Sequence, residues 1–172
     1  MSNEILKLLF LVMLKRSFQP IVSSTTQILI LGSLPGDKSL VENEYYAHPQ
    51  NRFWKVIKYL FNAPEPISYT ERIGILLRNN IGFWDVCAEA SRPGSMDLAI
   101  QNERPNAIAE LLETHTSIKH IIFNGQKAYS LYLKHFEKKA GIIYSCLPST
   151  SPANAKSNLE DLIEHWRIII SD

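Results

Sequence analysis

Two features on which many proteins depend are scarce in this sequence: cysteine and an excess of charge of one sign. The chain has only two cysteines, Cys87 and Cys146, which lie far apart and within apolar runs. This pattern favours buried, reduced thiols over a disulfide framework, and it is typical of a cytoplasmic protein. Eighteen Lys and Arg residues against 17 Asp and Glu leave a net charge of +1. Any affinity for nucleic acid must therefore come from a local arrangement of residues, because the surface as a whole is not basic.

A long apolar run is also missing. The first residues, "MSNEILKLLFLVML", have a short apolar core that contains Lys7, an acidic Glu4 before it, and no A-x-A-like cleavage site after it. They fit neither a signal peptide nor a segment that spans a bilayer, so we expect no membrane association. We expect residues 1–16 to be an N-terminal extension, either an added amphipathic helix or the product of a start codon upstream of Met13. Residues 17–172 are expected to form one domain.

What the sequence does contain is a regular alternation of apolar runs and helical patterns, with 45% hydrophobic residues, enough for one sizeable core. Ser68 begins a capping box, and Asn106 can cap the helix that follows it. Strands are expected over residues 27–32, 80–86, 118–125 and 141–149, and helices over residues 51–61, 68–78, 106–115, 126–139 and 155–170. Residues 88–105 are interpreted as a polar connection. This order predicts an α/β fold, a three-layer α/β/α domain with a central four-stranded parallel sheet.

The loop after the first strand, "GSLPGDKS", resembles a phosphate-binding loop but departs from it in two ways. In the Walker A motif the second glycine directly precedes the lysine, whereas Asp37 separates Gly36 from Lys38 here. The interval between the two glycines is also one residue short, and a carboxylate beside a phosphate would repel it. A nucleotide hydrolase that uses Gly36, Lys38 and Ser39 remains an alternative, and a requirement for magnesium would support it.

Ligands of parallel α/β sheets bind outside the carboxyl ends of the strands. In this chain those ends carry residues 32–36, Asp85, residues 124–125 and residues 147–154, which include most of the unusual polar residues. We therefore expect one binding site at this edge of the sheet.

Five motifs occur in order along the chain: "GSLPGDKSL", "YYAHPQNRFW", "IGFWDV", "FNG" and "LPSTSPAN". Together they resemble the uracil-DNA glycosylase superfamily from about Ser17 onward, and they are most similar to its hypoxanthine-DNA glycosylase (DNA-deoxyinosine glycosylase) branch. The resemblance implies a uracil-DNA glycosylase-like fold. It also implies a repair enzyme that hydrolyses the N-glycosidic bond of a deaminated base, most of all hypoxanthine, and leaves an abasic site. The expected partner is DNA that contains such a base, and we expect a monomer without cofactor or metal.

The sequence departs from the pattern of its relatives at two catalytic positions. Mismatch-specific relatives have an asparagine in the first loop that orients the attacking water, and Leu34 occupies that position here. Several relatives also have a histidine in the last loop that stabilises the departing base, and this loop has none. The resemblance to the hypoxanthine branch assigns the water to Asn51, with Asp37 as a competing candidate. The alternative role of Asn51 is to cap the helix that begins near Phe53.

The resemblance and the chemistry of the residues together predict the contacts of the flipped base. Tyr46 matches an aromatic position that stacks on the base, although it can also be a core residue. An ionised Asp85 only accepts hydrogen bonds, so it would attract the N1–H of hypoxanthine and repel the bare N1 of adenine. Uracil N3–H would satisfy the same acceptor. The complete expected base-binding set is Ser33, Leu34, Pro35, Gly36, Tyr46, Phe53, Asp85 and Asn124, with the amides of the first loop facing the 6-oxo group.

The last loop matches the segment that enters the minor groove in the superfamily. Its hydroxyl groups can bind phosphates or replace the missing histidine, and its prolines keep it stiff. The expected DNA-binding residues are Ser39, His48, Pro148, Ser149, Thr150, Ser151, Pro152, Ala153 and Asn154. No lysine lies among the expected pocket residues, so we expect a monofunctional glycosylase. The remaining alternatives are a glycosylase for uracil or for G/U mismatches, and a catalytically silent module that binds DNA lesions.

Overall fold

The computed structural model describes residues 14–64 and 67–170 and has four parallel strands at its centre, as predicted. The strand order is β3-β2-β6-β7. The strands are β2 (Ile28–Gly32), β3 (Ile81–Asp85), β6 (His120–Asn124) and β7 (Ile143–Leu147). Strands β2, β3 and β6 are buried almost throughout, which explains their continuous apolar sequences. The expected α/β fold is confirmed.

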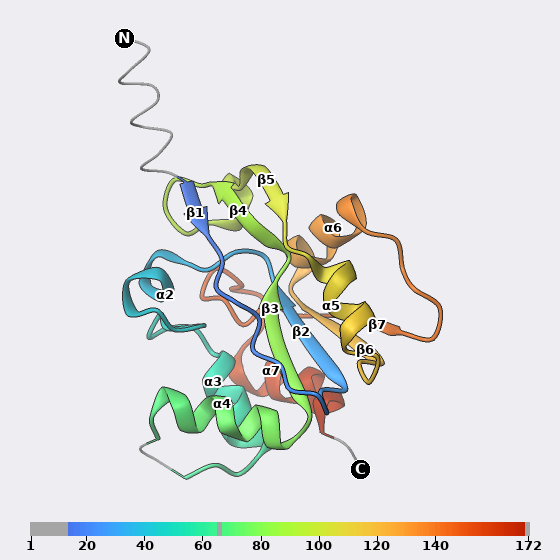
Figure 1. The fold of residues 1–172 in the computed structure, drawn as a ribbon. Helices are drawn as coiled ribbons and strands as arrows, with labels where there is room; N and C mark the ends of the chain where they lie inside the picture. Colours follow the sequence, from blue (N-terminus) through green and yellow to red (C-terminus); the bar gives the residue numbers. More distant parts are fainter. Residues whose placement is uncertain (1–13, 65–66, 171–172) are drawn as a thin grey trace.

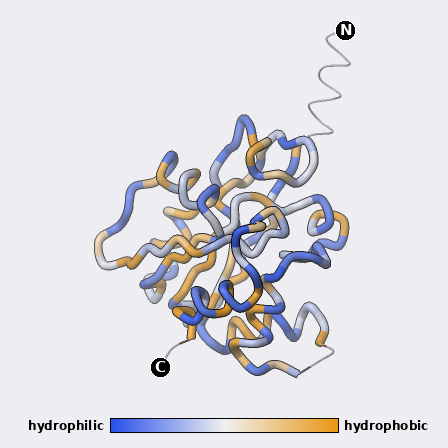
Figure 2. Tube along the Cα trace, turned by 180° about the vertical axis from the view of Figure 1, so that it is seen from behind, coloured by the Kyte–Doolittle hydropathy of each residue, from blue (hydrophilic) through white to orange (hydrophobic). Residues whose placement is uncertain are grey.

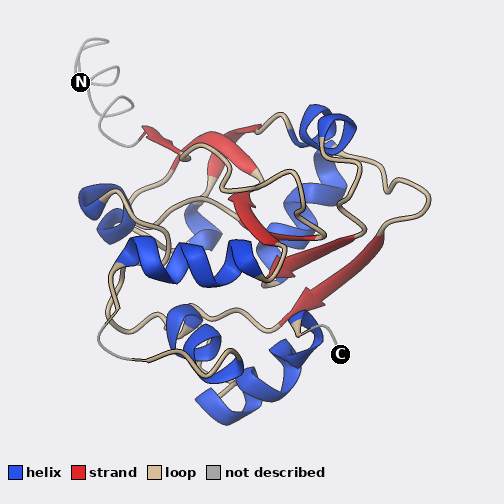
Figure 3. Ribbon diagram, turned by 60° about the horizontal axis from the view of Figure 1, so that its bottom comes forward, coloured by secondary structure: helices blue, strands red, loops and turns tan. Residues whose placement is uncertain are grey.

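Helices cover both faces of this sheet (Figures 1 and 3). They are α3 (Phe53–Leu60), α4 (Tyr69–Arg78), α5 (Ile108–Thr114), α6 (Gln126–His135) and α7 (Leu159–Trp166). Each corresponds to an expected helix, with ends that differ by a few residues. The capping box of α4 is present, because the Ser68 side chain accepts from the Glu71 amide and Glu71 in turn accepts from the Ser68 amide. A short helix, α2 (Asp37–Glu42), lies in the first loop and was not predicted.

A second, antiparallel sheet stands at one end of the molecule, near the top in Figure 1, and it corrects the interpretation of residues 88–105 as a polar connection. Its order is β1-β4-β5, with β1 (Leu14–Arg16), β4 (Cys87–Ser91) and β5 (Gln101–Pro105). A short 3₁₀ turn, η1 (Asp97–Ala99), precedes β5. The hairpin was missed because β5 is mostly exposed and polar, so it has no apolar alternation. Of the expected N-terminal extension, β1 joins this sheet, while residues 1–13 lie outside the described residues.

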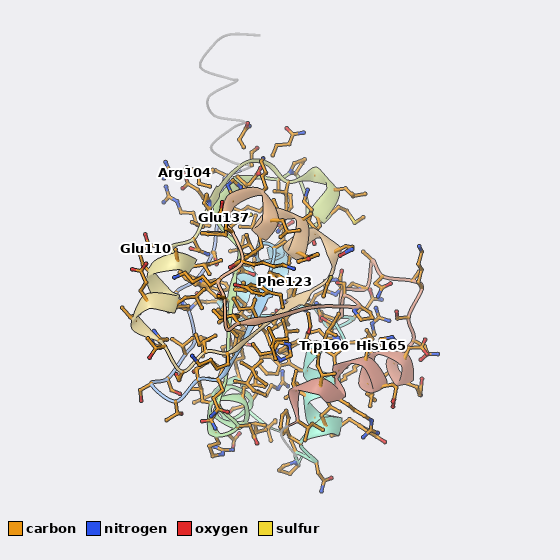
Figure 4. All side chains as sticks on the ribbon, turned by 90° about the vertical axis from the view of Figure 1, so that its right-hand side faces the viewer. Arg104, Glu110, Phe123, Glu137, His165 and Trp166 are labelled. Atoms are coloured by element: carbon orange, nitrogen blue, oxygen red, sulfur yellow. The ribbon has the colours of Figure 1, made fainter. Side chains whose placement is uncertain are left out.

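The hydrophobic core lies between the parallel sheet and its helices. Figure 2 shows the apolar segments concentrated in the interior and the polar ones in the outer loops. In Figure 4, Phe123 and Trp166 lie toward the middle of the molecule, whereas Arg104 lies at its outline. Both aromatic side chains are fully buried, and Trp166 packs edge-on against Phe53 with 5.8 Å between ring centroids. This contact joins α7 to α3 on one face of the sheet.

Two expectations about single residues are wrong. Cys146 is exposed and lies on β7, at the edge of the parallel sheet; Cys87 is buried, and both thiols are free. Asn106 does not cap α5, since its side chain donates to the backbone carbonyls of Asp85 (2.8 Å) and Cys87 (3.1 Å). It therefore fixes the junction between β3 and β4. None of the helices within the described residues is long and apolar enough to cross a membrane.

Candidate active site

A cavity of about 300 Å³ opens at the carboxyl edge of the parallel sheet. Its walls come from the loop after β2, residues 45–51, the turn between β4 and β5, the last loop, and the carboxyl ends of β3 and β6. The lining residues are Gly32, Ser33, Leu34, Pro35, Gly36, Asp37, Lys38, Ser39, Tyr45, Tyr46, His48, Asn51, Asp85, Arg92, Ser95, Met96, Asp97, Asn124, Ser149, Ser151, Pro152 and Ala153. The cavity has the size of a small-molecule site. It brings together most of the residues that the sequence assigned to the base.

Asp85 ends β3 and lies on the inner wall, with only 4% of its surface exposed. Ser17 Oγ donates to its Oδ2 at 2.8 Å. A Cβ atom on Gly32 would lie 2.7 Å from Asp85 Oδ1, so glycine is required where the carboxyl group meets the neighbouring strand. Burial raises the pKa of Asp85 to about 7, helped by the charge of Asp97 and opposed by the Ser17 hydrogen bond. Asp85 is thus a hydrogen-bond acceptor above neutral pH and also a donor below it.

The first loop is held by a buried arginine that the sequence did not reveal. Arg92, in the turn after β4, is 1% exposed. Its guanidinium donates to the carbonyl oxygens of Leu34 (3.3 Å), Pro35 and Gly94 (3.2 Å). Asp97 Oδ1 lies 3.5 Å from Nη1 of the same side chain and accepts from Ser33 Oγ at 2.7 Å. In the sequence "RPGS" indicates only a turn, and the two first-loop carbonyls that Arg92 binds lie almost sixty residues away.

The backbone amides of Leu34 and Gly36, in the first loop, are available to bind a ligand. Within residues 14–64 and 67–170, the amides of Leu34 and Gly36 have no hydrogen-bond acceptor. Both residues line the cavity, and the Leu34 side chain is buried in the core, so Leu34 contributes its backbone to the site. Unpaired amides on a cavity wall suit a ligand oxygen that carries negative charge.

Tyr46 forms one side of the cavity in a conformation that is rare for a bulky residue, with φ of 57°. Its ring stacks on Phe53, with 3.9 Å between centroids and 24° between planes. Its buried hydroxyl has no hydrogen-bond partner within the described part of the chain. Phe53 is fully buried and does not line the cavity, so it supports Tyr46 from behind and does not reach a bound base.

The two candidates for the water occupy different positions. Asn51 lines the cavity, and its Oδ1 accepts from the Phe53 amide at 2.9 Å, so it also caps the start of α3. Asp37 lies at the rim with its side chain about half exposed, and it is paired with Lys15. The hydrogen bond from Lys15 lowers the pKa of Asp37, which keeps this carboxylate ionised and occupied. Asn51 is therefore the better placed of the two.

The last loop is fastened to the body of the domain by Asn124 and Arg52. Asn124 Nδ2 donates to Thr150 Oγ1 (3.0 Å), and its Oδ1 accepts from the Thr150 amide (2.9 Å). The Arg52 guanidinium donates to the carbonyl oxygens of Ser151 (2.7 Å) and Asn154 (2.9 Å). Sequence reasoning missed Arg52. An arginine that stands between Asn51 and the first apolar residue of α3 indicates only a polar helix start.

Several expected DNA-binding residues are buried or hydrogen-bonded within the protein. Thr150 is fully buried, and Ser39 is 5% exposed with its Oγ accepting from the Ala47 amide. Pro148 and Asn154 do not line the cavity; the Asn154 side chain donates to the Ser149 carbonyl. The remaining expected residues of the last loop, together with the exposed His48, do line it.

Lys38 also lines the cavity, although no lysine was expected there. Its side chain is partly exposed and pairs with Glu42 at 2.6 Å, which directs the amine to the rim. The described residues contain no group of three or more His, Cys, Asp or Glu side chains arranged to hold a metal ion.

Comparisons with known proteins point to one family. The sequence profile of the uracil DNA glycosylase superfamily matches residues 20–169. A protein named hypoxanthine DNA glycosylase from Methanosarcina barkeri is 36% identical over 148 residues, which are 84% of this chain and 91% of the relative. A protein of the same name from Methanosarcina acetivorans is 37% identical over 147 residues, 84% of this chain and 90% of the relative.

The fold also matches a solved structure. A solution NMR structure of a proposed uracil DNA glycosylase from Methanosarcina acetivorans superimposes with a TM-score of 0.75 at 34% identity, covering 91% of this chain and 99% of that one. The chain therefore belongs to the uracil DNA glycosylase superfamily.

Proposed function

We propose that this protein is a monofunctional DNA glycosylase that removes hypoxanthine from DNA and leaves an abasic site. The observation that carries the proposal is the buried Asp85 carboxyl group on one wall of the same cavity as the unpaired amides of Leu34 and Gly36. The two relatives described above, both named hypoxanthine DNA glycosylase, support the same conclusion.

The cavity offers an acceptor beside donors, and this pattern matches one edge of hypoxanthine. Its N1–H can donate to ionised Asp85 while its 6-oxo group accepts from the loop amides. Adenine presents a bare N1 acceptor and a 6-amino donor, so both contacts would be repulsive. A site that leaves polar groups unpaired discriminates strongly against the wrong ligand. Uracil offers the same N–H and C=O pair, so a uracil glycosylase is the second candidate.

The reaction replaces the bond from C1′ to N9 of hypoxanthine by a bond from C1′ to a water oxygen. As the C1′–N9 bond breaks, its electron pair leaves with the base, and the sugar develops oxocarbenium character. The water then adds to C1′ and releases its proton to the base or to solvent. The protein must hold the water and stabilise charge on the base, and neither task requires a strong general base.

Asn51 is the proposed water ligand. The hydrogen bond from the Phe53 amide fixes the orientation of its side-chain amide, and Oδ1 retains a second lone pair for a water hydrogen. Tyr46 provides the aromatic wall against which the extruded base lies. The base leaves the duplex at a cost of a few kcal/mol, part of which such a contact recovers. The last loop, fastened by Asn124, lines the same cavity and would contact the DNA beside the extruded base.

The test is base release from duplexes that hold one inosine, uracil, xanthine or normal base, in EDTA. We expect release from inosine, reduced at least 100-fold in Asn51→Ala and little changed in Asp37→Ala. Loss of the helix cap alone costs ~1 kcal/mol of stability. Ser68→Ala removes the cap of α4, which lies away from the cavity, and it is the matched control for that loss.

Each result has a distinct meaning. Release of uracil alone would move the specificity to the second candidate. Binding of inosine-containing DNA without release of any base would refute the enzyme and leave a lesion-binding module. Full activity in Asn51→Ala would show that Asn51 only caps α3.

A further inference from the structure

We infer that Arg92 is a positioning residue that turns the Gly36 amide toward the base and so replaces the leaving-group stabiliser missing from the last loop. This inference deepens the proposed function and rests on it. It concerns a side chain that the resemblance to known glycosylases did not single out.

The geometry of the peptide group carries the inference. In a trans peptide the C=O and the N–H that follows it point in opposite directions. The Pro35 carbonyl accepts from Arg92 Nη2, so the Gly36 N–H of the same peptide group points away from Arg92. That N–H has no acceptor in the described residues, and Gly36 lines the cavity.

The Leu34 amide is oriented in the same way, but a backbone hydrogen bond holds it and not a side chain. The Ser33 carbonyl accepts from the Cys87 amide at 3.0 Å, which fixes the opposite direction for the Leu34 N–H. The Leu34 amide is thus held by the junction of β3 and β4, and the Gly36 amide is held by the Arg92 guanidinium. A substitution of Arg92 would release only the Gly36 amide.

The charge of Arg92 has a second effect on the same peptide group. A cation at the carbonyl end withdraws electron density and makes the N–H a stronger donor. Arg92 is 1% exposed, whereas Lys38, the other Lys or Arg residue of the cavity wall, is partly exposed and pairs with Glu42. A buried charge is screened far less than one at the rim, so Arg92 would act more strongly on negative charge in the cavity.

A purely structural role for Arg92 is the competing explanation, since it also binds Gly94 and Asp97 within its own turn. The two roles differ in how they depend on the leaving group. Lost stabilisation of the departing anion slows a poor leaving group more than a good one. Lost structure slows every substrate by the same factor.

The experiment compares single-turnover release of hypoxanthine and 8-azahypoxanthine from matched duplexes. The extra ring nitrogen stabilises the departing anion, while the edge that faces Asp85 is unchanged. For Arg92→Met we expect hypoxanthine release to fall ~10²–10³-fold, the usual loss for one donor to a developing anion. The fold-reduction in 8-azahypoxanthine release should be at least ten times smaller than the fold-reduction in hypoxanthine release.

Two further variants keep the test decisive. Arg92→Lys retains the charge and reaches fewer carbonyls, so it should fold and show an intermediate loss with the same dependence on the leaving group. Arg104→Met removes an exposed arginine of the same hairpin, paired with Glu89 and outside the cavity, and should leave both rates unchanged. Arg104 lies at the outline of the molecule in Figure 4.

An equal loss for both bases in Arg92→Lys, or no loss, would overturn the inference while leaving the proposed function intact. If the wild-type protein released neither base, the proposed function itself would fail. The two failures are therefore distinguishable in one set of reactions.

Discussion

Replacing Asp85 by asparagine should change the pH dependence of stability in a way that few surface substitutions could imitate. The carboxyl group is 4% exposed, and burial raises its pKa from 3.8 to about 7. The folded protein therefore holds this proton over a range of pH in which the unfolded chain has released it. Asparagine occupies nearly the same space and carries no charge at any pH.

The sign and size of the effect follow from linkage. Between pH 3.8 and about 7 the folded state binds one more proton at Asp85 than the unfolded state does, so stability falls as the pH rises. The slope is ~1.4 kcal/mol per pH unit, and the complete change is at most ~4 kcal/mol. The contribution is fully present below pH 4 and absent above pH 7. Asp85→Asn lacks it, so its stability relative to the wild type should increase with pH.

The assay is urea unfolding of both proteins at half-unit steps from pH 4.5 to 8. The difference in unfolding free energy should grow by a few kcal/mol over this range and then level off. Asp37→Asn is the matched control, because Lys15 lowers the pKa of Asp37 below its usual value of 3.8. The Asp37 contribution is complete above that pH and is lost only below it, so the difference between Asp37→Asn and the wild type should stay nearly flat from pH 4.5 to 8. A flat difference between Asp85→Asn and the wild type would refute the description of Asp85 as a buried, proton-retaining group.

Three further predictions concern activity. Below pH 7 the kcat/KM for inosine-containing DNA should rise about tenfold per pH unit as Asp85 ionises. The pH profile of Asp85→Asn should be flat. Parallel profiles of the two proteins would exclude Asp85 as the acceptor of N1–H. Gly32→Ala places a Cβ 2.7 Å from Asp85 Oδ1 and should reduce base release at least tenfold, while Gly74→Ala, in helix α4 and outside the cavity wall, should retain full activity. Asn124→Ala removes both hydrogen bonds to Thr150, so the KM for DNA should rise more than kcat falls; an unchanged KM would show that the last loop is held by other contacts.

Much of the fold could be predicted because the parallel strands are buried. Residues 28–32 and 81–85 have apolar sequences that stand out, and the capping box at Ser68 begins its helix as expected. The hairpin of β4 and β5 has no such signal, because its strands are short, partly exposed and rich in polar or small residues. Its stability comes from pairing with β1 and from the Asn106 side chain, and these long-range contacts leave no local pattern.

The candidate site was predictable in part for the same reason. Side chains at the ends of parallel strands must meet at one edge, and Asp85 and Asn124 do so. Arg92 and Arg52 were not predictable, since each holds carbonyl groups of a distant loop and carbonyls have no residue signature. The role of Asn124 was only partly foreseen: it lies on the cavity wall, but its amide is used to hold Thr150.

If this cavity releases hypoxanthine by hydrolysis, the products of one reaction must be free hypoxanthine and an abasic site. Free hypoxanthine and abasic sites can be measured by chromatography in the same sample of inosine-containing duplex, with an adenine-containing duplex beside it. We expect equal amounts of the two products from inosine and neither from adenine. Strand breaks without free hypoxanthine, or equal release of adenine, would contradict this expectation.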